Sequence, residues 1–433
     1  MMKIFYWLYV FLSFGLFLIL FPAAWVYTRI TGHYRSHLGE RLGSISPEVT
    51  KHLSGSLLIW IHAASLGEVK VAVSIVNALR SMKSGCAFVL STNTPHGRKM
   101  AEELFGEDIP VIFAPIDFAP LIRRALKTLN PDILLFIETE IWPAWLFEAR
   151  RMGIGTALLN GRISARSVGK YMGMRPFFCG VLKNFDVFSM ISEEDAKRII
   201  AIGADPQKIE INGNAKYDHL GSGTDPQIET AIRKALNINE FQRVFVAGST
   251  RTGEEGMILD AYEKILEHFR DTILIIVPRH IERTPDIGSI IKARGYKYQT
   301  RSALQKGRAN RTEHIVIIDT FGELFRIYSI GTIVFCGASL VPLGGQNPLE
   351  PAIWGKVVFY GPSMEDFSDA KILLEKAGAG FQVTGPEMLA EKAVWFLDHP
   401  DELKARGKLG REEILKNIGA GERHALAVMK LIA

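Results

Sequence analysis

The chain has 433 residues, 48% of them hydrophobic and 22% charged, which predicts two or three folded domains and argues against disorder. Its formal net charge of +5 is too diffuse to indicate nucleic-acid binding. That charge suits a protein at an anionic membrane or one that handles phosphorylated substrates. The three cysteines, Cys86, Cys179 and Cys336, form no Cys-x-x-Cys motif, so the sequence indicates neither a disulfide framework nor a structural zinc site. A reducing, cytoplasmic compartment is the simplest interpretation.

The N-terminal segment from Ile4 to Tyr27 carries no charged residue. A run of about 24 such residues can cross a hydrocarbon core about 30 Å thick. Arg29, Arg35 and Arg41 follow it, so the positive-inside rule predicts that the rest of the chain lies in the cytoplasm. We therefore predict a membrane anchor over residues 1–27, with a helix lying in the membrane plane as the alternative. A cleaved signal peptide fits less well, because the run is long and no clean cleavage site follows it.

From residue 57 onward, short apolar runs alternate with amphipathic stretches of helical length, such as Glu68–Met82 and Glu193–Ile202. This alternation predicts a mostly parallel sheet with helices on both faces. In the first half of the chain, strands are predicted at Leu57–His62, Ala87–Ser91, Val111–Phe113, Ile133–Ile137, Thr156–Asn160, Val187–Ile191 and Ile209–Asn212.

A polar, glycine-containing stretch at His219–Pro226 predicts an interdomain linker. The pattern therefore indicates the α/β class, with two Rossmann-like domains at residues 28–218 and 219–433 facing a central cleft. Ligands of such open sheets bind at the carboxyl ends of the strands. In the second half, strands are predicted at Val244–Ala247, Thr272–Val277, His314–Ile318, Thr332–Phe335 and Val357–Tyr360.

The segment Gly337–Pro351 follows a predicted strand and opens a predicted helix. Gly344 and Gly345 allow the backbone to approach a ligand closely. Asn347 is a natural helix N-cap, with Pro348 at the first helical position and Glu350 at the third. This pattern of capping residues fits an ordinary helix start as well as it fits a nucleotide site. In a nucleotide site, Glu350 would accept hydrogen bonds from ribose hydroxyls.

Three further turns of the second half also follow predicted strands. Ser249 and Thr250 stand in a Gly-Ser-Thr turn that resembles an anion nest, although an ordinary helix cap is the commoner origin of such a turn. Arg279 follows the strand that ends in Val277-Pro278, and Arg283 adds positive charge. The last turn comprises Phe321, Gly322 and Glu323. Four strand-end turns of this kind in one domain favour a nucleotide site.

In the first half, Glu68 stands at the start of a helix that follows a strand, a position from which it can act as a general base. More commonly, such a carboxylate only interacts favourably with the helix dipole. Glu138 and Glu140 end the apolar strand before Trp142-Pro143. Strand alternation predicts both side chains on one face, and two buried like charges are costly unless they are used or paired.

Lys216, at the domain junction, either reaches into the cleft to neutralise a leaving phosphate or is a solvated linker residue. The sequence contains no Asp-x-Asp, His-Glu-x-x-His, Gly-x-Ser-x-Gly or P-loop motif, so it gives no support to a metal-dependent transferase, a zinc protease, an α/β-hydrolase or a kinase.

Together these segments resemble the bacterial 3-deoxy-D-manno-octulosonic acid (Kdo) transferases, and the resemblance runs in order through nearly the whole chain. Gln346 stands where the family usually has histidine. The matching segments are Tyr34–Leu42 (YRSHLGERL), His62–Glu68 (HAASLGE), Glu138–Pro143 (ETEIWP), Asn160–Arg166 (NGRISAR), Asn214–Asp218 (NAKYD), Gly248–Glu254 (GSTRTGE), Val277–His280 (VPRH), Phe321–Leu324 (FGEL) and Gly344–Glu350 (GGQNPLE).

The resemblance implies a GT-B fold, a CMP-Kdo donor, a lipid A precursor as acceptor and an inverting transfer that uses neither a metal nor another cofactor. It implies a bacterial inner-membrane enzyme with its catalytic body on the cytoplasmic face. Glu68 would be the base, and Glu138 and Lys216 would stabilise the transition state. The CMP contacts would be Pro278, Arg279, Phe321, Gly322, Glu323, Asn347, Pro348, Leu349 and Glu350. A different transferase that uses a UDP-sugar, or a non-catalytic binding protein, are the alternatives.

Overall fold

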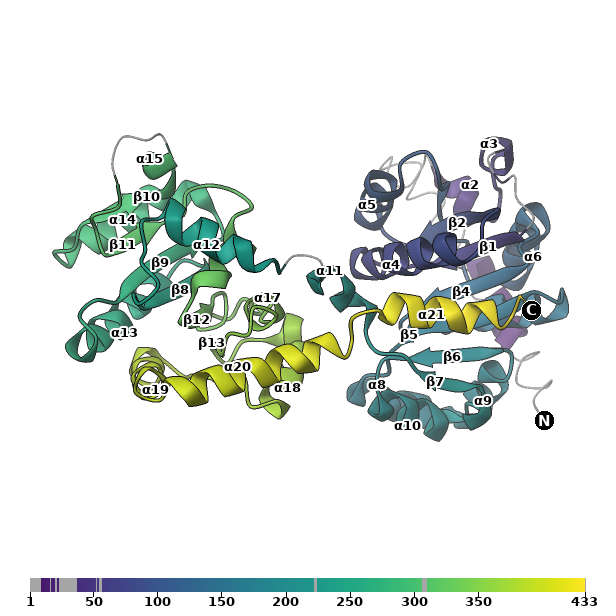
Figure 1. The fold of residues 1–433 in the computed structure, drawn as a ribbon. Helices are drawn as coiled ribbons and strands as arrows, with labels where there is room; N and C mark the ends of the chain where they lie inside the picture. Colours follow the sequence, from purple (N-terminus) through teal and green to yellow (C-terminus); the bar gives the residue numbers. More distant parts are fainter. Residues whose placement is uncertain are drawn as a thin grey trace. The chain divides into compact units, whose positions relative to one another are not determined.

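The computed structural model describes residues 9–15, 17–19, 22, 37–51, 53, 57–221, 224–305 and 310–432. These residues form two compact units (Figure 1). The first contains Met1–Asp218 together with Asn417–Ala433, and the second contains His219–Lys416.

The first unit is built on seven parallel strands in the order β3-β2-β1-β4-β5-β6-β7. Strand β4 reads Ile-Leu-Leu-Phe-Ile and is buried throughout, as expected of a strand with helices on both faces. The strand order reverses between β1 and β4, and this switch point is where open α/β sheets bind ligands. The strands are β1 (Leu57–His62), β2 (Cys86–Thr92), β3 (Val111–Phe113), β4 (Ile133–Ile137), β5 (Gly155–Gly161), β6 (Val187–Met190) and β7 (Ile209–Ile211).

Helices cover both faces of this sheet. Leu58 and Trp60 of β1 face one core with α6, α7, α9 and α10, whereas Ile59 and Ile61 face the other with α4, α5 and α21. The helices are α2 (Leu38–Arg41), α3 (Pro47–Lys51), α4 (Leu66–Met82), α5 (Pro95–Phe105), α6 (Ala119–Leu129), α7 (Pro143–Arg151), α8 (Ala165–Gly173), α9 (Arg175–Leu182), α10 (Glu193–Ile202) and α21 (Ala420–Met429), with 3-10 helices η2 (Pro206–Lys208) and η3 (Ala215–Tyr217).

Helix α21, the last of the described chain, packs beside α4 in the first unit (Figure 1). The Asp218 carboxylate accepts hydrogen bonds from the backbone N–H groups of Ala420 (3.1 Å) and Gly421 (2.8 Å) at its start. The buried His424 ring bonds the Ser189 hydroxyl, and burial lowers its pKa to about 3. The sequence division assigned residues 417–433 to the second domain. They belong to the first because α21 fills its core, a long-range contact that periodicity does not reveal.

The second unit has seven parallel strands in the order β10-β11-β9-β8-β12-β13-β14, with its switch point between β8 and β12. The sequence did not predict β10 and β14, because these edge strands have three residues each and lack a continuous apolar run. The strands are β8 (Val244–Thr250), β9 (Ile273–Pro278), β10 (Tyr298–Thr300), β11 (Ile315–Ile317), β12 (Ile333–Cys336), β13 (Val358–Tyr360) and β14 (Gly380–Gln382).

Helices α13, α14 and α19 cover one face of this sheet, and α12 and η5 pack on the other. Helix α11 (Asp218–Gly221) connects the two units. The helices of the second unit are α12 (Pro226–Ala235), α13 (Glu254–His268), α14 (Thr284–Ala293), α15 (Arg301–Gln305), α16 (Leu324–Ile327), α17 (Leu349–Ala352), α18 (Ser368–Lys376), α19 (Pro386–Asp398) and α20 (Pro400–Leu415), with 3-10 helices η4 (Ile281–Arg283), η5 (Tyr328–Ile330) and η6 (Glu365–Phe367).

The predicted membrane anchor, residues 1–27, lies in large part outside the described residues. Its described part, 9–15 and 17–19, is helical and packs on the first unit. Tyr9 donates a hydrogen bond to the half-buried Asp117 carboxylate (2.5 Å), and Phe17 stacks on Phe118. Over the described residues, no helix has the length and hydropathy that a membrane span requires.

Gly421 allows α21 to approach α4 closely, and its replacement tests how far the first unit depends on this contact. A Cβ atom at Gly421 would lie 2.1 Å from Ser74 Oγ and 2.8 Å from Asp218 Oδ2. We expect Gly421→Ala to lower the free energy of unfolding by about 1–3 kcal/mol through overpacking, as measured by urea denaturation.

The matched control is Gly169→Ala, at a helical glycine with no atom within 4 Å of the added Cβ. That change should be neutral or stabilise by up to about 1 kcal/mol. Equal effects of the two substitutions would contradict the close-packing interpretation.

Candidate active site

Glu68 lies in the first turn of α4, directly after β1, and its side chain is only 8% exposed. One carboxylate oxygen accepts the backbone N–H of Ala64 and the other accepts the Ser65 hydroxyl, each at 2.8 Å. Burial raises the pKa of Glu68 to about 7, and the nearby charges of Glu140 and Glu138 add to the rise. A carboxylate with this pKa is an effective base near neutral pH.

Glu138 and Lys216 form an ion pair, with Nζ 2.5 Å from Oε1. Glu138 follows β4 in the left-handed region of backbone conformation, at φ 61°, which a non-glycine residue adopts rarely. Lys216 lies on η3, whose N-cap is Asn214. The Asn160 side chain, at the end of β5, fixes this helix by accepting the backbone N–H of Ala215 (2.9 Å). Lys216 is therefore held in the site and is not a solvated linker residue.

The Glu140 side chain lies in the same region as Glu138, as predicted, but strand alternation is not the reason. Strand β4 ends at Ile137, so Glu138 and Glu140 belong to a turn and strand alternation does not govern their directions. The Glu140 carboxylate accepts the indole N–H of Trp142, and its Oε2 lies 3.4 Å from Nε2 of His62. The sequence pattern indicated no role for His62, although its place at the last position of β1, beside the switch point, was a usable signal.

Glu68, Glu138, Glu140, Lys216 and His62 thus gather at the carboxyl ends of β1 and β4. The group combines a base with a raised pKa, a lysine that can offset negative charge and further carboxylates. This combination suits the removal of a proton from a hydroxyl and the stabilisation of a charged leaving group. Among the described residues, no three His, Cys, Asp or Glu side chains are placed to hold a metal ion.

In the second unit, the ends of β8 and β12 have strained backbone at the switch point. Ser249 has φ 55° and Ala338 has φ 57°, both in the left-handed region. Thr250 is fully buried, and its hydroxyl has no hydrogen-bond partner among the described residues. Such strain is concentrated at functional sites in proteins.

The Glu254 side chain occupies one amide of the predicted anion nest at Gly248–Glu254 and three amides of the loop after β12. The buried Glu254 carboxylate accepts the backbone N–H groups of Arg251, Ala338, Ser339 and Leu340 at 2.7–3.0 Å. Burial raises the pKa of Glu254. These four amides are therefore not available to a phosphate, and Glu254 instead ties α13 to the loop after β12.

Arg279, after β9, is exposed, and its backbone N–H donates to the Thr250 carbonyl (3.1 Å), which places the turns after β8 and β9 side by side. Pro278 is the last residue of β9. Arg283 does not add free positive charge, because it forms two hydrogen bonds with the buried Glu255 carboxylate (2.7 and 3.0 Å).

The turn after β11 presents an exposed aromatic ring. The Phe321 side chain is 87% exposed, and Gly322 follows with φ 80°. Glu323 stands at the N-cap position of α16 without a side-chain capping hydrogen bond, and its carboxylate binds Arg301 (3.0 Å). The ring of Phe321 is therefore accessible to a ligand.

The segment Gly344–Glu350 differs in detail from the predicted helix start. Helix α17 begins at Leu349, one residue later than expected, with Pro348 at the N-cap. The Asn347 side chain accepts the Leu349 N–H (3.1 Å). Both glycines have φ near 80°, and a Cβ at Gly344 would lie 2.4 Å from Asp366 Oδ2. Glycine is thus required here by local structure, whether or not a ligand approaches.

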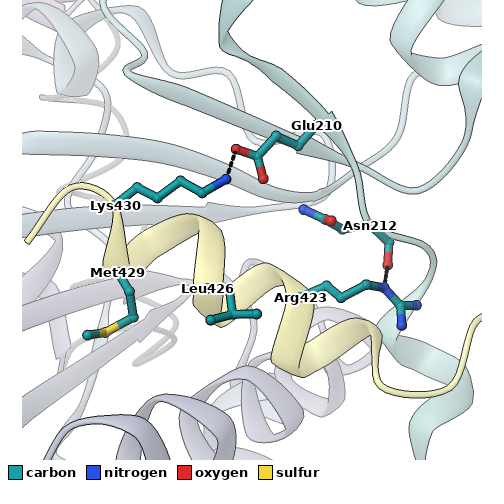
Figure 2. A pocket seen from close by; sticks show the side chains of 6 residues that line it. All are labelled: Glu210, Asn212, Arg423, Leu426, Met429 and Lys430. Atoms are coloured by element: carbon teal, nitrogen blue, oxygen red, sulfur yellow. Dashed lines mark hydrogen bonds and ion pairs between the residues drawn. The ribbon is translucent and has the colours of Figure 1, made fainter.

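A groove of about 540 Å³ lies on the first unit between β7 and α21 (Figure 2). Lys430 pairs with Glu210 across it (2.6 Å), and Arg423 donates to the backbone carbonyl of Asn212 (2.8 Å). Leu426 and Met429 complete the lining. None of the predicted site residues lines this groove, so it is separate from the group around Glu68.

Comparison with known proteins identifies relatives over most of the chain. Residues 36–219 match the family model described as 3-deoxy-D-manno-octulosonic-acid transferase (kdotransferase). The 3-deoxy-D-manno-octulosonic acid transferase of Rickettsia felis is 30% identical over 361 residues, which are 83% of this chain and 75% of the relative. A bifunctional glycosyltransferase/methyltransferase of Fusobacterium nucleatum is 35% identical over 76% of this chain, and the chain spans about half (51%) of that relative.

Solved structures support the fold. UDP-GlcNAc 2-epimerase from Neisseria meningitidis matches with a TM-score of 0.57 and 14% sequence identity, over 86% of this chain and 100% of the epimerase chain. The α/β class with two parallel seven-stranded sheets is confirmed, and the fold is GT-B-like. Given this fold and the extent of the sequence matches, the chain belongs to the 3-deoxy-D-manno-octulosonic acid transferase family and is a glycosyltransferase.

Proposed function

We propose that this enzyme transfers Kdo from CMP-Kdo to a lipid A precursor, with inversion at the anomeric carbon and without a metal ion. The observation that carries the proposal is the raised pKa of Glu68, about 7, at the switch point of the unit that the family model matches. Glu68 takes the proton from the acceptor hydroxyl. The hydroxyl oxygen then bonds to the anomeric carbon as the bond to the CMP phosphate oxygen breaks.

Lys216 and Glu138 stabilise the transition state. The ammonium group of Lys216 offsets negative charge that develops during the transfer, and the Glu138 carboxylate holds the lysine in place at 2.5 Å. In the second unit, exposed Arg279 supplies positive charge for the CMP phosphate. These side chains then provide the charge compensation that a metal ion provides in other transferases.

The strand-end turns of the second unit hold CMP. Phe321 offers an exposed ring for stacking, and the Glu350 carboxylate accepts hydrogen bonds from ribose hydroxyls. Because Glu254 occupies the backbone N–H groups of Arg251, Ala338, Ser339 and Leu340, the contacts to CMP come from other groups of the strand-end turns. Those turns contain Ser249, Thr250, Pro278, Arg279, Phe321, Gly322, Glu323, Asn347, Pro348, Leu349 and Glu350.

The N-terminal apolar segment attaches the enzyme to the cytoplasmic face of the bacterial inner membrane, where its lipid acceptor lies. Phe11, Leu12 and Ile19 in its described part are exposed, which supports contact with a lipid surface. The net charge of +5 favours an anionic membrane in the same way.

Replacing the base tests the mechanism directly. Glu68→Gln should lower kcat by about 10²- to 10⁴-fold, because the amide cannot accept the proton, while CMP-Kdo binding persists. CMP release in the presence of the lipid A precursor measures the rate, and calorimetry measures donor binding. The control Glu103→Gln, at an exposed glutamate of α5, should leave both unchanged. Normal turnover of Glu68→Gln would refute the assigned role.

The pH profile follows from the pKa of Glu68. The group must be deprotonated to act, so kcat/KM should fall about tenfold per pH unit below a midpoint near pH 7 and level off above it. The measurement is CMP release between about pH 5 and pH 9. A profile that is flat across pH 7 would show that Glu68 does not act as the base.

Nucleotide specificity tests the second unit. CMP should raise the melting temperature and UDP should not, whereas equal stabilisation by UDP would favour a UDP-sugar transferase.

Glu350→Ala should weaken CMP binding by about tenfold to a hundredfold through the loss of ribose hydrogen bonds. Glu391→Ala, at an exposed position of α19, is the control. Unchanged CMP affinity in Glu350→Ala would remove that residue from the site.

A further inference from the structure

Glu140 differs from the other two carboxylates of the site in its partners. Glu138 is paired with Lys216, and Glu68 accepts two hydrogen bonds from its own turn. Glu140 accepts the neutral indole N–H of Trp142. In the part of the chain that the structure describes, His62 is the one basic side chain within 4.0 Å of it. The Glu140 charge is therefore compensated mainly by neutral donors.

His62 is fully buried at the end of β1, and its two ring nitrogens have different neighbours. Nδ1 lies 3.0 Å from the Ser91 hydroxyl, which also accepts the indole N–H of Trp60 (2.9 Å). Nε2 lies 3.4 Å from the Glu140 carboxylate, without the geometry of a hydrogen bond, and it has no hydrogen-bond partner in the described chain. A carboxylate only accepts, so the hydrogen belongs on Nε2 and Nδ1 accepts from Ser91. Hydrogen bonds therefore link Trp60, Ser91 and His62, and the Nε2 edge of the His62 ring faces the Glu140 carboxylate at 3.4 Å.

Glu140 lies near the proposed base, Glu68. The charges and dipoles that face Glu68 are the Ala64 amide and Ser65 hydroxyl of its own turn, Glu138 and Glu140 after β4, and Lys216 on η3 beside Gly67. After burial, Glu140 is the largest influence that raises the pKa of Glu68, larger than that of Glu138. Burial raises the pKa of the Tyr171 phenol on α8, and the nearby charge of Glu140 adds to the rise.

We propose that Glu140 and His62 are positioning residues for the transfer: His62 holds the Glu140 carboxylate beside Glu68, and the negative charge there keeps Glu68 a strong base. The inference rests on the proposed function, in which Glu68 takes the proton of the acceptor. Neither residue touches the reacting atoms. Glu138 cannot fill this role equally, because Lys216 neutralises its charge.

The pH profile of Glu140→Gln tests the proposal. The amide oxygen can still accept from Trp142 and His62, but the charge is gone. The midpoint of the acid limb of kcat/KM should fall by about one pH unit, because a like charge no longer opposes ionisation of Glu68. The rate on the plateau should fall about threefold, because a weaker base removes the proton more slowly.

The matched control is Glu148→Gln, which removes a buried carboxylate of the same unit that binds Arg123 and does not influence the pKa of Glu68. It should lower the melting temperature and leave the midpoint unchanged. A midpoint that stays at the wild-type value in Glu140→Gln would overturn the proposal.

Two substitutions of His62 give an independent test, whatever the stability of Glu140→Gln. The side-chain amide of His62→Gln can place an N–H near the position of Nε2, and it should retain the midpoint and most of the rate. His62→Phe keeps the aromatic packing but lacks the donor, and it should lower kcat with little change in KM and shift the midpoint. Circular dichroism establishes folding of both variants. Equal behaviour of the two variants would overturn the role of His62.

Failure of this inference is distinguishable from failure of the proposed function. If Glu68→Gln is inactive and the wild type has its midpoint near pH 7, the function stands, and an unmoved midpoint in Glu140→Gln refutes only the role of Glu140. If Glu68→Gln turns over normally, the proposed mechanism fails first.

Nitrogen-15 NMR adds a structural readout: the His62 signal, assigned by its loss in His62→Gln, should be that of the Nε2–H tautomer, and an Nδ1–H tautomer would contradict the arrangement.

Discussion

Electrostatic repulsion among three carboxylates at one edge of a sheet is the constraint on which the first unit depends. Glu68, Glu138 and Glu140 converge where the strand order reverses, and desolvation alone would penalise their charges. Each carboxylate has different partners. Lys216 pairs with Glu138, and backbone and hydroxyl donors bind Glu68. The indole of Trp142 and the imidazole of His62 face Glu140. Removal of any one partner alters the balance among all three.

Both units use strained backbone at the ends of central strands to orient their side chains. Glu138 and Asn160 in the first unit, and Ser249 and Ala338 in the second, all have φ between 52° and 61°. Each such residue costs of order 1–3 kcal/mol, which the surrounding parallel sheet must offset. The rigid strands thus hold conformations that the turn residues would not adopt by themselves. Glu138, Ser249 and Ala338 lie at the two switch points, and Asn160 lies at the end of the next strand, β5.

The apolar runs were sufficient to predict the central strands, since fully buried parallel strands such as β4 have a strong and simple signal. The proposed catalytic positions Glu68 and Lys216 followed from strand-end placement and family resemblance. Edge strand β10 could not be predicted, because three half-buried residues have little periodicity. The left-handed turn at Glu138 and the binding of Glu254 to the amides after β12 were equally hidden, because both depend on contacts between distant segments.

The return of α21 to the first unit affects the order in which the protein forms during synthesis. The core beside α4 includes Ala420, Ala425 and Val428, which the ribosome adds only after the whole second unit. At usual elongation rates the intervening chain takes about 10–40 seconds to translate. During that time the second unit can fold as a continuous segment, whereas the first exposes an apolar face that chaperones recognise. The unit translated first is therefore the last to be completed.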